Sequence, residues 1–131
     1  MDIEDIEKQL KILRNEKNMS FINAAERHMN SPTIYKIERG ENYTLKSFFK
    51  YLSVLDATLL VDDNAVSSQI EMGIILQAKR IALGYSLRKF EREVGLTPTK
   101  LANIEKGRGC AKKNLLKYLS IIPVTFKLIH T

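Results

Sequence analysis

The feature that most constrains the fold of this chain is an internal repeat. A shift of 67 residues places IYKIERGENYTLKSFFKYLSVLDATLLV over LANIEKGRGCAKKNLLKYLSIIPVTFKL. The segment Lys50-Tyr51-Leu52-Ser53 then coincides with Lys117-Tyr118-Leu119-Ser120, and Ile37, Glu38, Gly40 and Thr58 also meet identical residues. Upstream, Arg14 and Ser20 match Arg80 and Ser86 at a shift of 66, so the first copy is one residue shorter there. Two copies indicate a duplicated small domain rather than a solenoid.

Each copy has the apolar spacing of a helical domain. The expected stripes of the opening helices are Ile3, Ile6, Leu10 and Leu13 in the first copy and Ile70, Ile74, Ile75, Ala78 and Ile81 in the second. Gly84, or Asn18 in the first copy, ends this helix, and Ser86 or Ser20 caps the next one. That second helix covers about 86–93 and ends at Gly95.

Thr97-Pro98 and Ser31-Pro32 start a third helix, with a serine or threonine cap before a proline in the first turn. It runs to Gly107 or Gly40, where glycine suits a left-handed cap. A fourth amphipathic helix is predicted at about 45–55 and 112–122. Its expected core residues are Phe48, Phe49, Leu52 and Leu55, matched by Leu115, Leu116, Leu119 and Ile122.

Each copy closes with a short segment that favours extended structure, Ala57–Val61 and Val124–Ile129. A lone strand leaves its backbone unpaired, so we expect the two to pair antiparallel across a pseudo-twofold axis; a longer final helix is the alternative. The predicted fold class is mainly α, with a first domain at 1–62, a linker at 63–69 and a second domain at 70–131.

Short helices in second and third place, joined by a tight turn, describe a helix-turn-helix. The segment GYSLRKFEREVGLTPTKLANIEKGR resembles the lambda-repressor-like, Cro/XRE family of DNA-binding domains. The resemblance lies in the opening serine, the turn Val94-Gly95-Leu96, Thr97, and the closing Ile104-Glu105-Lys106-Gly107. The first copy, NMSFINAAERHMNSPTIYKIERGEN, is a weaker match, with Ala24 and Ala25 in its second helix and His28-Met29-Asn30 in place of the glycine turn.

The resemblance implies that the third helix of each copy, about 98–106 and 32–39, enters the major groove. In the second copy it selects Thr99, Lys100 and Asn103 as base-reading residues, with Pro98 adding apolar contact. These side chains suit the task, since asparagine pairs with adenine, lysine donates to guanine and a threonine methyl contacts thymine. Leu101 and Ile104 would face the core.

Glu105 is expected to be structural, because phosphates would repel its carboxylate. The expected phosphate-binding residues of the second copy are Ser86, Arg88, Lys89, Lys106, Arg108, Lys112 and Lys113. The first copy offers Ser31, Thr33, Tyr35 and Lys36 at the groove positions, and Ser20, its helix cap, as a phosphate-binding residue.

Charge is distributed unevenly between the copies. Residues 1–66 contain 9 Lys/Arg and 11 Asp/Glu, whereas residues 67–131 contain 12 Lys/Arg and 4 Asp/Glu, within an overall charge of +6. A basic half joined to a mildly acidic one suggests a surface for a polyanion, with a merely solvated basic face as the alternative. Glu38, Glu41 and Asn42 flank the third helix of the first copy, so that half either binds DNA with fewer phosphate contacts or binds a protein.

Other functional classes lack support in the sequence. No phosphate loop, nucleophile elbow or HExxH motif is present, so we expect no enzyme activity, cofactor or metal. Cys110 is the single cysteine, which excludes an internal disulfide and leaves an inert thiol or, beside Lys112 and Lys113, a redox-sensing one. The acidic start of the chain lacks an apolar signal region, and no apolar run approaches the length of a membrane span, so we expect a cytoplasmic location.

The leading hypothesis is therefore a sequence-specific double-stranded DNA-binding transcriptional regulator, in the first place a repressor, of the prokaryotic or phage type that the resemblance implies. It would read two unlike half-sites with one chain, and it could also form a homodimer. One alternative is an antitoxin or adaptor whose first copy binds a protein partner. Another is a nucleoid-type binder that discriminates little between sequences.

Overall fold

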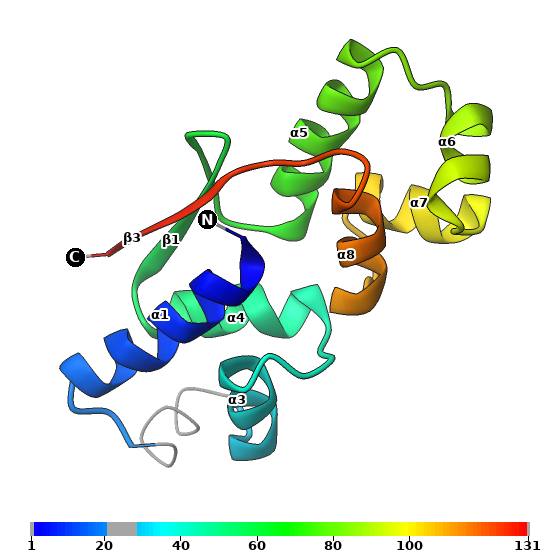
Figure 1. Ribbon diagram of the computed structural model, residues 1–131. Helices are drawn as coiled ribbons and strands as arrows, with labels where there is room; N and C mark the ends of the chain where they lie inside the picture. Colours follow the sequence, from blue (N-terminus) through cyan, green and yellow to red (C-terminus); the bar gives the residue numbers. More distant parts are fainter. Residues whose placement is uncertain (1, 21–28, 131) are drawn as a thin grey trace.

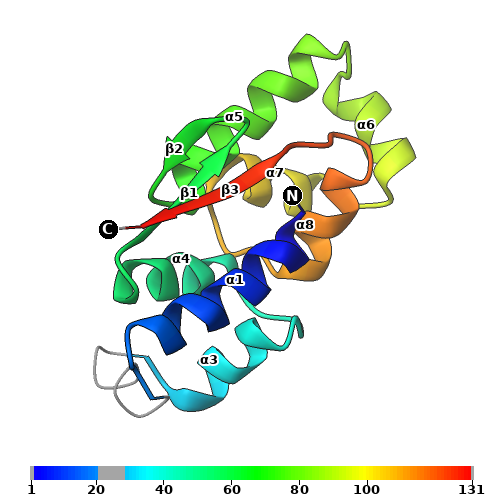
Figure 2. The same ribbon diagram turned by 60° about the vertical axis from the view of Figure 1, so that its left-hand side comes forward.

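The computed structural model describes residues 2–20 and 29–130. This part of the chain is mainly helical and carries one small antiparallel sheet (Figures 1 and 2). The helices are α1 (Ile3–Glu16), α3 (Ser31–Glu38), α4 (Leu45–Val54), α5 (Gln69–Ala82), α6 (Leu87–Val94), α7 (Pro98–Lys106) and α8 (Lys112–Leu119). The strands are β1 (Ala57–Val61), β2 (Asn64–Val66) and β3 (Phe126–His130). Ala24, Ala25 and His28, and the predicted second helix of the first copy, lie outside the described residues.

Helices α1 and α5 begin and end at equivalent residues of the repeat. Asp2 caps α1 and Ser68 caps α5. The side chain of each accepts a hydrogen bond from the backbone amide three residues later. Asn18 and Gly84, which follow the two helices, both have positive φ angles, 55° and 85°. The two residues of each pair are 66 positions apart in the sequence. The shift of 66 that relates the upstream sequences therefore also relates the ends of the two helices.

The cap of α3 differs from the prediction. Asn30, not Ser31, caps this helix, because its Oδ1 accepts a hydrogen bond from the Thr33 amide at 2.8 Å. Ser31 lies in the first turn instead. Since Asn30 stands 67 residues before Thr97, the cap of α7, the one-residue change of register falls before residue 30.

The apolar stripe predicted for α5 is also wrong. The buried residues of this helix include Met72, Gly73 and Leu76, whereas Ile70, Ile74 and Ile81 are 57%, 62% and 61% exposed; Ile75 is partly buried and Ala78 is exposed. The physical reason is the close approach of α7: a Cβ atom on Gly73 would lie 2.3 Å from the Glu105 carbonyl oxygen. Helix α5 therefore turns its glycine, not its isoleucines, toward the core. The α1 stripe is confirmed, since all four of its residues are buried.

Helices α4 and α8 supply the centre of the core, as predicted. Phe48, Phe49, Leu52 and Leu55 are buried in the first copy. In the second copy Leu115 and Ile122 are buried and Leu119 is half-buried, but Leu116 is exposed. Helix α8 ends at Leu119, three residues before the predicted end.

The predicted antiparallel pairing of the two closing segments is confirmed. Strand β1 pairs with β3, with Leu60 opposite Lys127, and no longer final helix forms among the described residues. The segment predicted as a linker contributes β2, which pairs with the other edge of β1. Asp62 and Asp63 turn the β1–β2 hairpin with positive φ angles, 47° and 65°, as a tight hairpin turn requires.

Two sets of backbone contacts relate the copies by a pseudo-twofold axis. In the sheet, Leu60 faces Lys127, and in an isolated bridge Thr44 faces Ala111. The residues of each pair are 67 apart, so each residue faces its own equivalent, as a twofold relation requires. The Leu45 amide donates to the Cys110 carbonyl at 2.8 Å, and this bond has its symmetric counterpart from the Lys112 amide to the Tyr43 carbonyl at 2.8 Å.

A buried ion pair joins the copies beside this axis. The Lys112 ammonium, on α8, lies 2.7 Å from Oε2 of Glu7, on α1, and the two side chains are only 5% and 2% exposed. Lys112 also donates to the Gly40 carbonyl at 2.8 Å, and the Tyr43 hydroxyl donates to Glu7 at 2.5 Å. Burial and this bond to Glu7 raise the pKa of Tyr43 well above its ordinary value, so its hydroxyl stays protonated.

This ion pair breaks the symmetry of the repeat. The equivalents of Glu7 and Lys112 in the other copy are Gly73 and Leu45, neither of which carries a charge. Pairing two first copies would bury two glutamates without a lysine, and pairing two second copies would bury two lysines without a carboxylate. Because an unpaired buried charge is costly, the ion pair favours contact between unlike copies.

The ion pair gives a testable prediction for stability. Glu7→Met leaves the Lys112 ammonium buried with only a carbonyl partner, so we expect a loss of about 3–5 kcal/mol in the free energy of unfolding. Glu7→Met combined with Lys112→Met removes both charges and should recover most of that loss. Urea denaturation of the two single variants and the double variant measures the coupling; strictly additive losses would contradict the account.

The α5–α7 contact gives a second prediction. Gly73→Ala adds a Cβ against the Glu105 backbone and should destabilise the chain by about 1–3 kcal/mol through overpacking. This loss opposes the gain of about 1 kcal/mol that alanine normally brings to a helix interior. Gly109→Ala is the control, because no atom lies within 4 Å of its added Cβ. Equal thermal stability of the two variants would show that the close approach is absent in solution.

Candidate nucleic-acid interface

Helices α6 and α7 are two short helices joined by a tight turn. Ser86 caps α6 by accepting a bond from the Lys89 amide at 3.2 Å, and Gly95 ends it with a φ angle of 73°. Thr97 then caps α7 by accepting a bond from the Lys100 amide at 3.3 Å. The predicted start of both helices and the glycine turn are therefore confirmed.

Apolar packing fixes α7 against the rest of the second copy. Leu101 and Ile104 are fully buried, as predicted, and so are Phe90 of α6 and Tyr118 of α8. The rings of Phe90 and Tyr118 lie edge to face with centroids 4.8 Å apart. The inner face of α7 is thus packed into the core, and the first turn of its opposite face is exposed.

A buried ionic network holds the end of α7. Arg80 of α5 donates to both carboxylate oxygens of Glu105, at 2.6 and 3.1 Å, and to the Tyr85 carbonyl at 2.7 Å. The Tyr118 hydroxyl donates to Glu105 at 2.6 Å. The hydrogen bond to Glu105 raises the pKa of Arg80, and burial raises that of Tyr118. Glu105 is therefore structural, as the sequence indicated.

The first copy repeats this network residue for residue. Arg14 donates to both oxygens of Glu38, at 2.7 and 3.1 Å, and to the Met19 carbonyl at 2.7 Å. The Tyr51 hydroxyl also donates to Glu38. The two networks place α3 on α1 and α7 on α5 in the same way. The sequence carried this signal as matched arginine, glutamate and tyrosine residues in the repeat.

The predicted base-reading residues of the second copy lie on the outer side of α7. Thr99 and Lys100 are exposed, and Pro98 beside them is exposed as well. Asn103 is half-buried, one turn further along, and its carbonyl accepts the Arg108 amide at 2.8 Å. The first turn of α7 therefore presents short polar side chains and one cation to solvent.

Most of the predicted phosphate-binding residues surround this face on exposed positions. Within residues 2–20 and 29–130 none of their amines or guanidinium groups forms an ion pair with a carboxylate, and the Lys89 ammonium lies 5.1 Å from the centre of the Tyr85 ring. These residues are Ser86, Arg88, Lys89, Lys106, Arg108 and Lys113. The exposed cations come from α6, the end of α7, the segment that follows it and the start of α8.

Lys112 differs from the other predicted phosphate-binding residues. Its ammonium is buried against Glu7 and Gly40, so it is not available to a phosphate, whereas its neighbour Lys113 is exposed. Periodicity alone could not separate two adjacent lysines at the start of a helix. The residue at the equivalent of Lys112 in the first copy, Leu45, is the signal that position 112 faces inward.

Helix α3 carries the predicted residues of the first copy. Lys36 and Tyr35 are exposed, and the Arg39 guanidinium lies 4.9 Å from the centre of the Tyr35 ring. Thr33 and Ser31 are half-buried, and the Thr33 hydroxyl is bonded to Asn30 at 2.6 Å. Ser20 is exposed, but the helix that it was predicted to cap lies outside the described residues.

One exposed cation at this surface was missed. Lys46 is the second residue of α4 and the equivalent, 67 residues earlier, of Lys113 in α8. Both lie next to the Thr44–Ala111 bridge at the pseudo-twofold axis. The repeat itself contained the signal, since lysine occupies both positions.

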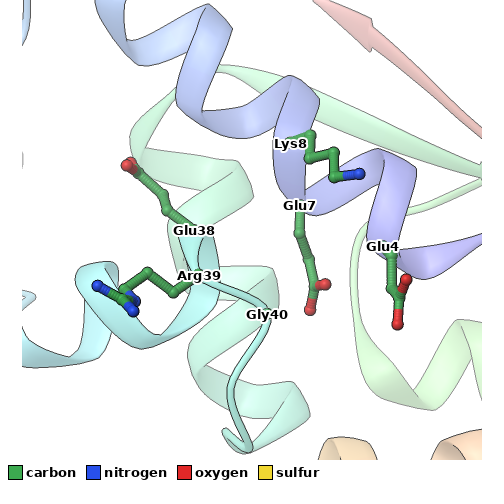
Figure 3. Close-up of a pocket in the computed structure, with 6 residues that line it drawn as sticks. All are labelled: Glu4, Glu7, Lys8, Glu38, Arg39 and Gly40. Carbon is green, nitrogen blue, oxygen red and sulfur yellow. The ribbon is translucent and has the colours of Figure 1, made fainter.

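A pocket of about 230 Å³ lies between α1 and the end of α3 (Figure 3). Its lining residues are Glu4, Glu7, Lys8, Glu38, Arg39 and Gly40. Two buried carboxylates in one pocket would suit acid–base chemistry if they were free. Here Glu7 is paired with Lys112 and Glu38 with Arg14, and Figure 3 shows the two carboxylates directed away from each other. Both therefore act in holding the fold.

Cys110 lies buried at the pseudo-twofold axis. Burial raises the pKa of its thiol to about 11, and its backbone carbonyl accepts the Leu45 amide. The nearby lysines do not activate it, since Lys112 is occupied and Lys113 points to solvent. These observations favour the inert thiol of the two alternatives that the sequence left open.

Comparisons with known proteins give no relative for this chain: no family model, no curated protein and no solved structure matches it. None of the helices in the described part of the chain is long and apolar enough to cross a membrane.

The state of Cys110 can be measured. Because the folded-state pKa is about 11, alkylation of native protein by iodoacetamide should be very slow at pH 8 and should accelerate only as the pH approaches 11. Unfolding the chain in urea should restore the rate of a free cysteine at pH 8. Fast alkylation of the native protein at pH 7–8 would instead favour a redox-sensing thiol.

Proposed function

We propose that this chain is a sequence-specific double-stranded DNA-binding protein with two helix-turn-helix units, and that it regulates transcription as a repressor by occupying a promoter. The observation that carries the proposal is the outer face of α7. Its first turn exposes Thr99 and Lys100 among exposed cations from α6, the end of α7 and the residues that follow it, while Arg80 and Glu105 hold the helix from inside. A rigid helix with a polar outer face and surrounding cations suits the major groove.

The chemistry of these residues divides them into a base-reading set and a phosphate-binding set. Lys100 and Asn103 have the donors and acceptors to distinguish base edges, and the Thr99 methyl can contact thymine. Arg88, Lys89, Lys106, Arg108 and Lys113 can neutralise phosphates, which fixes the register on DNA without reading its sequence. The proposed phosphate set excludes Lys112 and includes Lys46.

The pseudo-twofold relation supports a site with two half-sites. Helix α3 contacts α1 and α4, and α7 contacts α5 and α8, so the two helices have equivalent neighbours in the two copies. Twofold-related reading helices match half-sites about one helical turn apart. Because α3 presents Thr33, Tyr35 and Lys36 where α7 presents other side chains, the two half-sites should differ in sequence. Arg39 pairs with Glu41 at 3.6 Å, so the first copy offers fewer free cations.

Fluorescence anisotropy on genomic duplex fragments tests the proposal. Wild type should select particular fragments, and Thr99→Ala/Lys100→Ala/Asn103→Ala should retain only weak, salt-sensitive binding, since each good base contact contributes about 1–3 kcal/mol of discrimination. Equal affinity of wild type for all fragments would favour a nucleoid-type binder. No binding even near 50 mM salt would contradict the DNA-binding proposal.

The phosphate contacts give a separate prediction. Lys113→Gln and Lys46→Gln should each reduce the slope of log K against log salt by about 0.9, with sequence preference unchanged. Lys127→Gln is the matched control, because Lys127 is exposed on the sheet and pairs with Asp63 at 3.0 Å. A loss of slope in the control equal to that in the two test variants would show that the effect comes from net charge alone.

One observation favours a protein partner for the first copy. Tyr35 of α3 and Arg39, which directly follows the helix, form an exposed cation–π pair, and tyrosine and arginine are frequent at the centres of protein interfaces. In this alternative the chain is an antitoxin or adaptor. Tyr35→Ala separates the two functions: it should lower affinity for one DNA half-site if α3 reads bases, and leave DNA binding unchanged if α3 binds a protein.

A further inference from the structure

A groove of about 450 Å³ lies where α4, the start of α5 and the segment after α7 meet. Its lining is mainly apolar, with Phe49 and Ile70 as the large apolar side chains. Lys46 and Lys50 also line the groove, and both are exposed. Sites for small organic ligands commonly have roughly 300–1,000 Å³, with an apolar lining and a few polar groups. The groove therefore has the size and lining of a small-ligand site.

Two contacts fix one wall of this groove. The Gln69 side-chain amide donates to the Arg108 carbonyl at 2.6 Å, which ties the start of α5 to the segment after α7. The backbones are also close there, since a Cβ atom on Gly107 would lie 2.5 Å from the Ile70 Cα. The groove is therefore formed before any ligand binds.

The groove carries positive charge without a balancing carboxylate. Lys46 and Lys50 are four residues apart on α4, so they lie on the same side of the helix. In the part of the chain that the structure describes, neither ammonium is paired with a carboxylate, and no acidic residue is among those that line the groove. Glu71, which follows Ile70, accepts the Ser67 amide at 2.6 Å. An anion in the groove would therefore be attracted to both lysines.

The repeat shows how the other copy treats the same place. The pseudo-twofold equivalent of the groove is the region where α8 meets the start of α1, and both places have two lysines one turn apart. These pairs are Lys46 with Lys50 and Lys113 with Lys117. Beside α8, the start of α1 adds two exposed acidic residues, Asp2 and Glu4. Their equivalents in the groove, at a shift of 66, are Ser68 and Ile70. The groove thus keeps the cations but has a serine and an isoleucine in place of the two acids.

This difference restricts the chemistry of a ligand. Inorganic phosphate and the backbone of DNA bring negative charge but no apolar surface for Phe49 and Ile70. An apolar cation would be repelled by Lys46 and Lys50. A molecule with one carboxylate and an apolar body satisfies both parts of the groove.

We propose that this groove binds a small organic anion with an apolar body, of the type of a carboxylate of medium chain length. Lys46 and Lys50 bind its carboxylate, and Phe49 and Ile70 contact its apolar part. The proposal goes beyond the proposed function, because the groove does not include the outer faces of α3 and α7.

Titration of the isotope-labelled full chain with sodium octanoate, followed by backbone amide chemical shifts, tests the site without DNA. Octanoate should give saturable shifts at Ser68, Ile70, Gly107 and Gly109. Sodium phosphate, which lacks the apolar body, and octyltrimethylammonium chloride, which has the opposite charge, should not. Saturable shifts of the same size with phosphate, or an absence of saturable shifts with octanoate, would overturn the proposal.

Variants at equivalent positions of the repeat supply the matched controls. Lys50→Gln should weaken octanoate binding about fivefold, the upper value for an exposed ion pair (about 1 kcal/mol). Lys117→Gln removes the same charge from the equivalent position of α8 and should leave the affinity unchanged. Ser68→Asp/Ile70→Glu gives the groove the two acids of the other copy and should abolish binding. This variant should keep the wild-type melting temperature, since aspartate caps a helix as well as serine and Ile70 is 57% exposed. Equal losses in Lys50→Gln and Lys117→Gln, or octanoate binding by Ser68→Asp/Ile70→Glu, would contradict the site.

One consequence rests on the proposed function. Lys46 belongs to the proposed phosphate set, and Arg108 lies in the segment that forms a wall of the groove, so bound octanoate should weaken DNA binding. Fluorescence anisotropy with and without octanoate measures this effect, which should be absent in Ser68→Asp/Ile70→Glu. DNA affinity that stays unchanged at saturating octanoate would overturn this consequence. A chain that binds no DNA would contradict the proposed function, whereas the amide titration decides the groove in either case.

Discussion

The Glu7–Lys112 ion pair is the interaction on which the arrangement of the two copies depends. It joins α1 to α8, and both charged groups are buried away from water. The Tyr43 hydroxyl donates a further hydrogen bond to Glu7, and the Gly40 carbonyl accepts one from Lys112. In an exactly symmetric duplication, Glu7 and Lys112 would each have an identical equivalent in the other copy. Because the pair needs one residue from each copy, it selects the contact between unlike copies, and the sheet pairing of β1 with β3 follows the same axis.

Within each copy a second buried network positions the helix proposed to read DNA. Arg80, Glu105 and Tyr118 hold α7, and Arg14, Glu38 and Tyr51 hold α3 with nearly the same distances. Removing one member of such a network would leave a buried charge unpaired. Ionic contacts on their inner sides therefore hold both helices with the opposite faces outward, and the two helices differ in the residues that they expose.

Much of this architecture could be predicted from the sequence because the repeat doubled every local signal. Ser86, Thr97 and Gly95 were each identified from cap and turn chemistry, and the strand pairing followed from the need to satisfy two otherwise lone strands. The orientation of α5 could not be predicted from spacing, because a helix with apolar residues on two sides does not reveal which side packs. The glycine at position 73 decides this, through a contact with α7 that is distant in sequence.

The candidate interface shows the same limit at the level of single side chains. Thr99, Lys100 and Lys113 are exposed where the sequence placed them, whereas Lys112 is buried by a carboxylate 105 residues away. A long-range partner of that kind leaves no trace in local periodicity. Comparison of the two copies would have helped, since Leu45 at the equivalent position indicates an inward-facing site.

Selection of bound duplexes from a random pool by the full chain tests the central claim most directly. The account predicts enrichment of two unlike half-sites at one fixed spacing, about 10–10.5 base pairs between centres. Enrichment of a single half-site or of a palindrome, or no enrichment at all, would contradict a chain whose two unlike reading helices act as one rigid unit.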